Sequence, residues 1–305
     1  MSALLFPGQG SQIVGMGRSF YDNFDQVKNI FQVADETLNY KISKIIFEGP
    51  EDELQLTKNT QPAILTVSYS IFKILKDEFN LNLNSFSYFA GHSLGEYSAL
   101  VCAGSLDFKD ALFLLHERGK AMQNAVPNGE GAMIAVLGLK VDELTEFISK
   151  RKNKNGICEI ANDNAIGQII ISGNKDSVIS FQSELKEKKI KSIPLKVSAP
   201  FHCSLMRPAA DKMREKIKKT EFKKPSHKIV NNVTAKGVQD PNLIKNLLID
   251  QIFSTVKWRE SILNISNSGS KFVEIGPGKA LSGMVKRTLK DSYCFSINTL
   301  DDMKN

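Results

Sequence analysis

The sequence predicts an α/β fold: a large subdomain with a parallel sheet at its core, and a small ferredoxin-like subdomain inserted into it. Three observations support this prediction. Short apolar runs alternate with longer amphipathic runs, a Pro-Asn-Gly turn at 127–129 interrupts that alternation, and the order β-α-β-β-α-β follows. We therefore expect a discontinuous large subdomain at residues 1–127 and 199–305, around a small subdomain at 128–198.

The chain before the turn shows the alternation of strands and helices that favours a parallel sheet. Apolar runs of strand length are each followed by longer runs with apolar residues at helical spacing. The predicted strands are Ala3–Phe6 and Ser87–Ala90, and the predicted helices are Asp22–Leu38, Gln61–Phe79, Leu94–Ala103 and Phe108–Ala125.

The chain after the turn holds the ferredoxin-like order and then returns to the large subdomain. The insert is predicted to contain strands Gly131–Leu139, Cys158–Asn162, Gln168–Ser172 and Ser192–Val197, with helices Asp142–Lys150 and Lys175–Lys188. The return is predicted to contain helices Ala209–Lys218 and Asn242–Phe253, strands Lys228–Asn232 and Lys271–Ile275, and a last helix from Gly278 to Leu289.

Composition and the start of the chain limit the class of protein. The chain is 42% hydrophobic and 24% charged, which is ordinary for a soluble globular protein. No apolar run approaches the ~18–20 residues that span a bilayer, and Met1-Ser2 leads into the first strand without a signal peptide. The four cysteines are scattered, which favours reduced thiols over disulfides or a zinc site. We expect a cytoplasmic protein with no membrane contact.

The net charge of +7 leaves two explanations open for the lysine-rich stretches Lys186–Lys191 and Lys212–Lys224. They are either solvated helix faces or a surface that attracts an acidic partner. Nucleic acid is not an expected partner, because the basic runs lack interleaved aromatic residues and no nucleic-acid-binding motif occurs.

The segment Gly91-His92-Ser93-Leu94-Gly95 has the Gly-x-Ser-x-Gly pattern of a nucleophile elbow, a sharp turn from a strand to a helix. Such a turn lifts the serine hydroxyl clear of the sheet. The pattern alone arises by chance in roughly one chain of this length in ten, but here an apolar strand precedes it and an amphipathic helix follows it. We predict that Ser93 is a catalytic nucleophile and that the amide of Leu94 donates to an oxyanion. The alternative is a plain turn with an ordinary serine.

A serine nucleophile needs a base, and the chain has four histidines. His92 adjoins Ser93, so its side chain is expected to point away from the hydroxyl. His116 falls in a helical pattern and is expected to be a surface or satisfied core histidine, and His227 is expected to be solvated. His202 lies in a proline-containing loop, where functional residues concentrate, and we choose it as base, with a packed loop histidine as the alternative. No aspartate stands out as a third member, which argues against a standard Ser-Asp-His hydrolase.

Two further segments are candidates for the same site. Phe6–Gln12 lacks the Gly-Lys-Ser/Thr ending of a phosphate-binding loop, so it is either a second source of backbone N–H for an oxyanion hole or a plain turn. Arg118 lies in a helical pattern, and its planar fork suits a carboxylate. An isolated arginine on a helix is more often a surface charge.

Taken together, these segments resemble the malonyl-CoA:acyl-carrier-protein transacylases of fatty-acid synthesis and the related acyltransferase domains of polyketide synthases. The resemblance covers essentially the whole chain. The motifs together, in this order and at this spacing, are more specific than any single motif. It rests on Phe6–Gln12, Gly91–Tyr97, Arg118–Met122, Gly131–Met133, Gly167-Gln168, Ser198–His202, Gln251 and Glu274–Gly278. The family fold, a hydrolase-like α/β domain with a ferredoxin-like insert, agrees with the predicted order. At Ile166 many members carry proline, which puts only a loop conformation in doubt.

The resemblance implies a role for each residue of the catalytic centre. Ser93 is the nucleophile and His202 is its base. Gln251 orients His202 through a carbonyl oxygen, in place of the missing aspartate. The backbone amides of Gln9 and Leu94 form the oxyanion hole.

The resemblance also implies the substrate and the partner. Arg118 binds the free carboxylate of a malonyl group delivered by malonyl-CoA. Phe201 is similar to the bulky aromatic residue of malonyl-selecting members, so methylmalonyl is expected to be disfavoured, by only ~1–3 kcal/mol for one methyl group. The partner is acyl carrier protein, which is expected to be acidic, and neither a cofactor nor a metal is implied.

The implied reaction is a ping-pong acyl transfer through a serine ester, and two other functions stay open at this point. A serine hydrolase or thioesterase shares the elbow and the histidine, but it releases acid to water and has little use for Arg118. A non-enzymatic carrier-binding scaffold has no need of Ser93, His202 and Gln251. Nothing suggests an obligate oligomer, so we expect a monomer, and a free-standing chain favours fatty-acid over polyketide synthesis.

Overall fold

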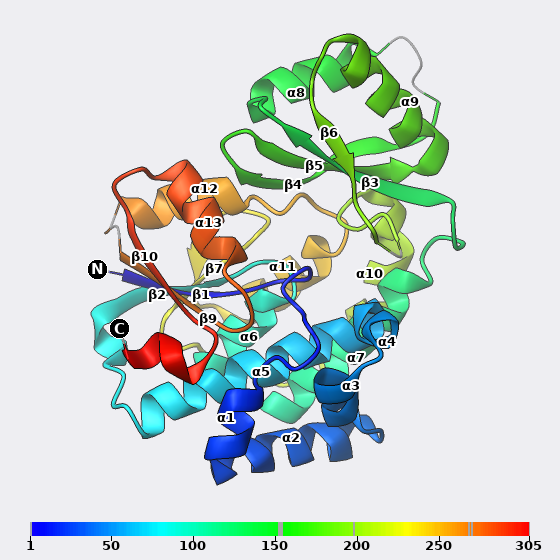
Figure 1. Cartoon of the computed structure of the whole chain (residues 1–305). Helices are drawn as coiled ribbons and strands as arrows, with labels where there is room; N and C mark the ends of the chain where they lie inside the picture. The colour runs from blue at the N-terminus through cyan, green and yellow to red at the C-terminus, as the bar shows by residue number, and fades with distance from the viewer. Residues whose placement is uncertain (1, 152–154, 198, 268, 270, 305) are drawn as a thin grey trace.

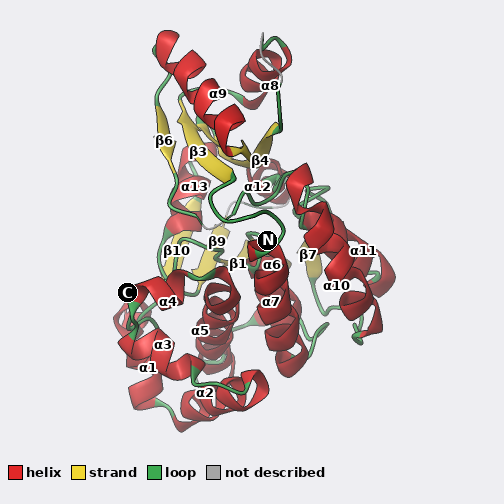
Figure 2. Ribbon diagram, turned by 90° about the vertical axis from the view of Figure 1, so that its right-hand side faces the viewer, coloured by secondary structure: helices red, strands yellow, loops and turns green. Residues whose placement is uncertain are grey.

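The computed structural model describes residues 2–151, 155–197, 199–267, 269 and 271–304. It shows two subdomains, a large one around a six-stranded sheet and a small one around a four-stranded sheet at the top of both views (Figures 1 and 2). The predicted α/β fold is confirmed. Ser198, the last residue of the predicted insert and the first of one motif, lies outside the described residues.

The large sheet has the strand order β10-β9-β1-β2-β7-β8. The strands from β10 to β7 are parallel to their neighbours, and only β8 pairs antiparallel. β1 is buried along its whole length, as expected for a central strand covered on both faces. The strands are β1 Ser2–Phe6, β2 Phe86–Gly91, β7 Lys228–Val230, β8 Gly237–Val238, β9 Lys271–Ile275 and β10 Tyr293–Ile297.

Helices cover both faces of this sheet because successive β1 side chains point to opposite faces. Leu4 and Phe6 pack into the larger apolar core, and Ala3 and Leu5 pack into a second core on the other face. The second core includes helices α12 Trp258–Ser266 and α13 Ala280–Thr288. The remaining helices of the large subdomain are α1 Arg18–Asn23, α2 Asp25–Leu38, α3 Ile42–Glu48, α4 Glu51–Gln55, α5 Thr57–Asp77, α6 Gly95–Cys102, α7 Phe108–Gln123, α10 Arg207–Lys219 and α11 Pro241–Gln251.

The small sheet has the order β4-β5-β3-β6 with all neighbours antiparallel, which is the predicted ferredoxin-like arrangement. The last predicted strand, Ser192–Val197, is too long. Its pairing with β3 ends at Pro194, and Leu195 and Val197 line a cavity instead. The elements are β3 Gly131–Leu137, α8 Val141–Ser149, β4 Cys158–Ala165, β5 Gln168–Asn174, α9 Lys175–Glu187 and β6 Ser192–Pro194.

β4 ties the small subdomain to the large one. Arg259 of α12 reaches Asp163 with its Nη2 at 2.8 Å from Oδ2, and Nε lies 3.0 Å from both carboxylate oxygens. Beside this ion pair, Asn162 forms a parallel bridge with Val256. These contacts fix the two walls of the cavity that lies between the subdomains.

Two predicted helices differ from the structure. The predicted helix Asp22–Leu38 begins three residues too early: α2 starts at Asp25, and Asp22 and Asn23 are the end of α1, because Phe24 between them has an extended backbone with φ −133° and ψ 118°. α5 begins at Thr57 instead of Gln61 and contains Pro62. Proline has no N–H to donate to the carbonyl of Lys58 four residues earlier. A side-chain nitrogen of another helix lies within hydrogen-bonding distance of that carbonyl instead, as described below.

Several short elements were not expected, and one histidine is placed differently. The helices α3, α4 and α12 and the strands β8 and β10 lie in stretches for which the sequence predicted no element. His227 is half-buried rather than solvated. Its ring stacks on Phe89 at 4.4 Å between centroids, and Nε2 lies 3.1 Å from the carbonyl of Leu83, because β7 lies beside β2. Among the described residues, no helix has the length and apolar character to cross a membrane.

Candidate active site

Ser93 stands on the turn between β2 and α6 with φ 52°, the left-handed backbone of a nucleophile elbow. The flanking glycine is required by space: a Cβ on Gly91 would lie 1.9 Å from the carbonyl of Gly95. The strand and the helix therefore cross in direct backbone contact. This geometry confirms the predicted turn and presents the Ser93 side chain to the cavity.

The Ser93 Oγ lies 2.8 Å from Nε2 of His202, and His202 Nδ1 lies 2.9 Å from the backbone carbonyl of Gln251. A carbonyl oxygen only accepts, so Nδ1 carries the proton and Nε2 is free to accept the serine proton. His202 is 5% exposed. Burial, and then the charge of Arg118, lowers the pKa of His202 from 6.5 to about 3, so the resting imidazole is neutral.

Arg118, on α7, is 1% exposed and points into the same site. Its Nη1 donates to Gln61 Oε1 at 2.7 Å, and its Nη2 donates to Gln251 Oε1 at 2.9 Å and to Ser93 Oγ at 3.1 Å. Among the described residues it makes no ion pair within 4.0 Å. A buried guanidinium with only neutral partners is suited to receive an anion from outside the chain.

α7 can place Arg118 there because it lies very close to the start of α5. A Cβ on Gly119 would lie 2.5 Å from the Cα of Lys58. The close contact brings Gln61 of α5 within hydrogen-bonding distance of the guanidinium, as described above.

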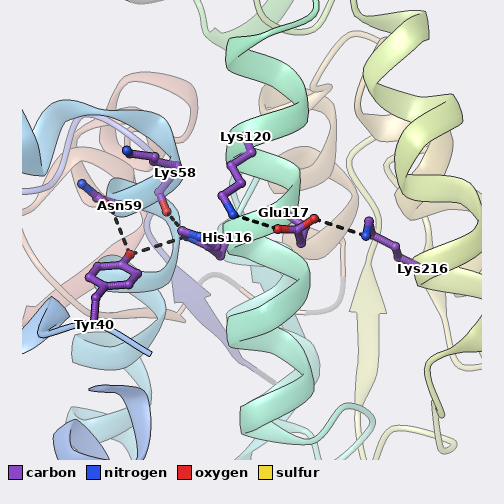
Figure 3. A network of polar contacts seen from close by, with 7 residues as sticks. All are labelled: Tyr40, Lys58, Asn59, His116, Glu117, Lys120 and Lys216. Carbon is purple, nitrogen blue, oxygen red and sulfur yellow. Dashed lines mark hydrogen bonds and ion pairs between the residues drawn. The ribbon is translucent and has the colours of Figure 1, made fainter. Parts of the chain in front are cut away.

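Figure 3 shows the two residues that precede Arg118 on α7, and each points toward a different neighbouring helix. His116 Nδ1 lies 3.0 Å from the carbonyl of Lys58, which is the carbonyl that the proline of α5 leaves without an intrahelical donor. Glu117 lies 3.2 Å from Lys216 Nζ of α10. His116 is half-buried and has a backbone partner, in agreement with the expected surface or satisfied core histidine, and both residues hold α7 between its neighbours.

Gln9 and Leu94 line the cavity from the loop after β1 and from the start of α6. The Gln9 side chain accepts from Thr57 Oγ1 at 2.9 Å, and Thr57 accepts in turn from Gln61 at 3.0 Å. This chain of hydrogen bonds joins the loop that carries Gln9 to the same glutamine that binds Arg118.

The cavity has a volume of about 590 Å³ and lies between the two subdomains. Phe201, beside His202, is 7% exposed and contributes to its wall. The small subdomain lines the opposite side with apolar residues, two amides and one lysine. These residues are Met133, Asn162, Asn164, Ile170, Leu195, Lys196 and Val197.

His92 is a lining residue of the cavity, but its side chain is directed to partners other than the Ser93 hydroxyl, as expected. Its ring lies against Trp258, and its Nε2 lies 2.8 Å from Asn164 Oδ1 of β4. The small subdomain provides this partner, which the local chain around the elbow did not indicate.

Three polar residues of the site were missed by the sequence reasoning: Glu96, Asn232 and Gln61. Asn232 accepts from the Ser93 N–H at 2.7 Å and donates to the Gly91 carbonyl at 2.8 Å, so it braces the elbow from below. Glu96 is a fully buried carboxylate on the mainly apolar helix α6. Two features of the sequence could have indicated these residues: a charged residue within such a helix, and a pair of asparagines that follows a strand. No group of three or more His, Cys, Asp or Glu that could hold a metal ion occurs in the described part of the chain.

Comparisons with known proteins agree with this geometry. A family model for the acyl transferase domain matches residues 3–304. The malonyl CoA-acyl carrier protein transacylase of Bacillus subtilis (strain 168) is 45% identical over 287 residues, which are 93% of this chain and 89% of that protein.

Two solved structures are equally similar in fold. The acyl-carrier-protein-S-malonyltransferase from Bartonella henselae has a TM-score of 0.95 at 40% identity, covering 99% of this chain and 97% of that one. A malonyl-transacylase solved in complex with its type II PKS acyl-carrier protein has a TM-score of 0.95 at 38% identity, with the same coverage. The chain therefore belongs to the acyl transferase family and, within it, to the malonyl CoA-acyl carrier protein transacylases.

Proposed function

We propose that this chain transfers a malonyl group from malonyl-CoA to the phosphopantetheine thiol of an acyl carrier protein, through an ester on Ser93, in fatty-acid synthesis. One observation carries the proposal: the buried guanidinium of Arg118 lies 3.1 Å from the Ser93 hydroxyl and has no ion pair among the described side chains. A malonyl group bound as an ester on this serine has a free carboxylate that can reach the cation. The names of the relatives support the same substrate and partner.

In the first half-reaction, Ser93 Oγ attacks the thioester carbonyl while His202 Nε2 takes the serine proton. The oxyanion is received by the backbone amides of Gln9 and Leu94, each worth up to about 4 kcal/mol in such sites. The C–S bond breaks, and CoA leaves as a thiol with the proton from His202.

In the second half-reaction, the carrier's pantetheine thiol gives its proton to His202 and attacks the ester carbonyl. The new C–S bond forms, the bond to Ser93 Oγ breaks, and His202 returns the proton to Oγ. Reactants and products are at the same oxidation level, so the protein groups suffice, and we propose that no metal or cofactor takes part.

Arg118 has a second effect on the base. Its positive charge is one cause of the low pKa of His202. A malonyl carboxylate bound to Arg118 offsets that charge, so the imidazole becomes a better proton acceptor when the correct substrate is present.

The proposal extends to the setting of the reaction. We propose a cytoplasmic monomer whose lysine-rich surface meets an acidic carrier and that does not bind nucleic acid. Four free cysteines support the reducing compartment, and the net charge of +7 supports the acidic partner. If charge steers the carrier, the transfer rate should fall as salt is added, whereas a flat salt titration would count against this part.

Intact-protein mass spectrometry after incubation with malonyl-CoA tests the function. We expect one malonyl-sized adduct on the wild-type chain and none on Ser93→Ala. Ser98→Ala is the matched control: Ser98 is a fully buried serine of α6, the helix that follows the elbow, and its replacement should leave the adduct unchanged. Absence of an adduct on the wild type would refute the proposed function.

A further inference from the structure

Glu96 is the buried carboxylate closest in sequence to the nucleophile, and its partners are all neutral. It is 1% exposed and lies in the first turn of α6. It accepts from the Asn231 side-chain amide at 2.6 Å, from the Asn232 backbone N–H at 3.1 Å and from Gln251 Nε2 at 2.8 Å. No Lys, Arg or His among the described residues lies within ion-pair distance of it.

The direction of these hydrogen bonds is fixed by groups that cannot reverse. Asn231 Oδ1 accepts from two backbone N–H groups, at 2.8 and 3.2 Å, so its NH₂ faces Glu96. Gln251 Oε1 accepts from Arg118 Nη2, which is only a donor, so the Gln251 NH₂ also faces Glu96. The Gln251 side chain therefore lies between the guanidinium and the carboxylate, with its oxygen on the cation and its nitrogen on the anion.

The arrangement of guanidinium, amide and carboxylate lowers the cost of burying two charged groups at the site. A buried charge without compensation is costly, and Arg118 and Glu96 are both buried without a direct ion pair. A carboxylate bound directly to Arg118 would occupy the fork that has to receive the substrate. With one amide between them, the opposite charges still stabilise each other, and the guanidinium stays available.

We infer that Glu96 is a positioning residue: acting through the Gln251 side chain, it is the counter-charge that holds Arg118 in place for the substrate carboxylate. The identity of that carboxylate rests on the proposed function. Burial raises the pKa of Glu96 to about 7, against the opposing effect of its hydrogen bonds and of Arg118. Experiments therefore belong at about pH 8.5, where such a group is ionised.

The competing explanation is a structural clamp on the elbow, through the Asn232 backbone. Asn232 is also held by the Ser93 N–H and the Gly91 carbonyl, so it has other anchors. A clamp would make the cost of losing Glu96 independent of Arg118, whereas a counter-charge makes it depend on Arg118.

A double-mutant cycle on thermal unfolding separates the two explanations. Glu96→Gln should lower the Tm of the wild type by several degrees, because it leaves Arg118 uncompensated. In an Arg118→Ala background, the same change should raise the Tm or lower it much less, because it removes an unpaired buried carboxylate. An equal or greater lowering in that background would overturn the inference. If Glu96→Gln does not fold, Glu96→Asp gives a weaker form of the cycle: it keeps the charge but withdraws it from the Gln251 amide, so the difference between the two backgrounds should have the same sign and be smaller.

Asp35→Asn is the matched control, because Asp35 is also a buried carboxylate but lies on α2 and accepts from Ser43. Its effect on the Tm should be the same in both backgrounds. The cycle does not depend on catalysis, so its failure is distinct from failure of the proposed function.

The kinetic readout is the division of the effect between KM and kcat. Glu96→Gln should raise the KM for malonyl-CoA about 10-fold and change kcat less than about 3-fold, because it loosens the carboxylate anchor. Glu96→Asp should lie between Glu96→Gln and the wild type. A lower kcat at unchanged KM would place Glu96 on the elbow and would contradict the inference.

Discussion

Arg118 Nη2 donates to Ser93 Oγ across 3.1 Å, so a permanent cation contacts the nucleophile. The same hydroxyl lies 2.8 Å from His202, which is neutral at rest. A hydrolase of neutral esters has no use for a buried cation at this position. In our account, this contact is the reason that the site selects an acyl group with a second, free carboxylate.

Replacement of the cation should therefore change acyl selectivity. Arg118→Ala should lower kcat/KM for malonyl-CoA by about 100-fold or more, since a charge-assisted bidentate contact is worth about 3 kcal/mol. Transfer of acetyl groups should be retained or should increase. Arg214→Ala is the control, because Arg214 is an exposed residue of α10 that forms an ion pair with Asp211 of the same helix. Equal losses for malonyl and acetyl groups would show that Arg118 does not recognise the carboxylate.

The base should leave a signature in the pH dependence of stability. His202 has a folded pKa of about 3 and an unfolded value near 6.5. Between these values the unfolded chain binds more protons, so the free energy of unfolding should fall as the pH drops below 6.5, by at most about 1.4 kcal/mol per unit. Urea unfolding of the wild type and of His202→Ala from about pH 7 to about pH 5 measures the difference. Parallel curves would mean that the imidazole titrates normally in the folded state.

The brace under the elbow should matter for stability as well as for activity. Asn232→Ala leaves the Ser93 N–H and the Gly91 carbonyl without their partner. Each unpaired buried group costs about 1–3 kcal/mol, so the free energy of unfolding should fall by several kcal/mol, and Ser93 should acylate more slowly. Asn264→Ala, which removes one amide hydrogen bond to the Ala235 carbonyl away from the site, should cost less. A change within about 0.5 kcal/mol for Asn232→Ala would contradict the role of the brace.

The space around two glycines predicts opposite effects of alanine substitution on stability. Gly91→Ala places a Cβ 1.9 Å from the Gly95 backbone and should prevent native folding. Gly283, on α13, has nothing within 4 Å of a built Cβ, so Gly283→Ala should stabilise by up to about 1 kcal/mol through helix propensity. Calorimetric Tm values test both, and a well-folded Gly91→Ala protein would mean that strand and helix are not in contact.

The wall of the cavity should set the tolerance for a branched acyl group. Phe201 is buried beside His202 and lines the cavity. Phe201→Ala should raise the kcat/KM ratio of methylmalonyl-CoA to malonyl-CoA by about 10-fold, in the range of one methyl group. Leu195→Ala is the control on the opposite wall. An unchanged ratio would remove Phe201 from the explanation of selectivity.

Local sequence patterns predicted most of the fold. Apolar runs such as Ala3–Phe6 and the glycine-flanked Ser93 carry their signal within a few residues, and the structure places both as expected. The break at Phe24 had no such signal, because its flanks continue the helical spacing of apolar residues. Short elements such as β8 depend on pairing with a distant strand, which a local pattern does not contain.

The residues of the site also differ in whether a local sequence pattern could identify them. The elbow and the loop histidine were identifiable from their own segments, whereas Arg118 and Gln251 gained roles only from a resemblance that covers the whole chain. Glu96 and Asn232 were missed because their function comes from contacts more than a hundred residues apart in sequence. Charged and amide side chains are usually exposed, and those of this site have a role because they are buried. Burial is a property of the assembled fold and not of a local segment.

The most direct test of the account is the fate of the isolated malonyl ester on Ser93. The adduct is formed with malonyl-CoA, freed of CoA, and divided between buffer and buffer with holo acyl carrier protein, and intact mass is followed over time. The account predicts an ester that persists in buffer and transfers malonyl to the carrier thiol, with return of the unmodified chain. Rapid release of malonate to water, unchanged by the carrier, would contradict it and would make the protein a hydrolase.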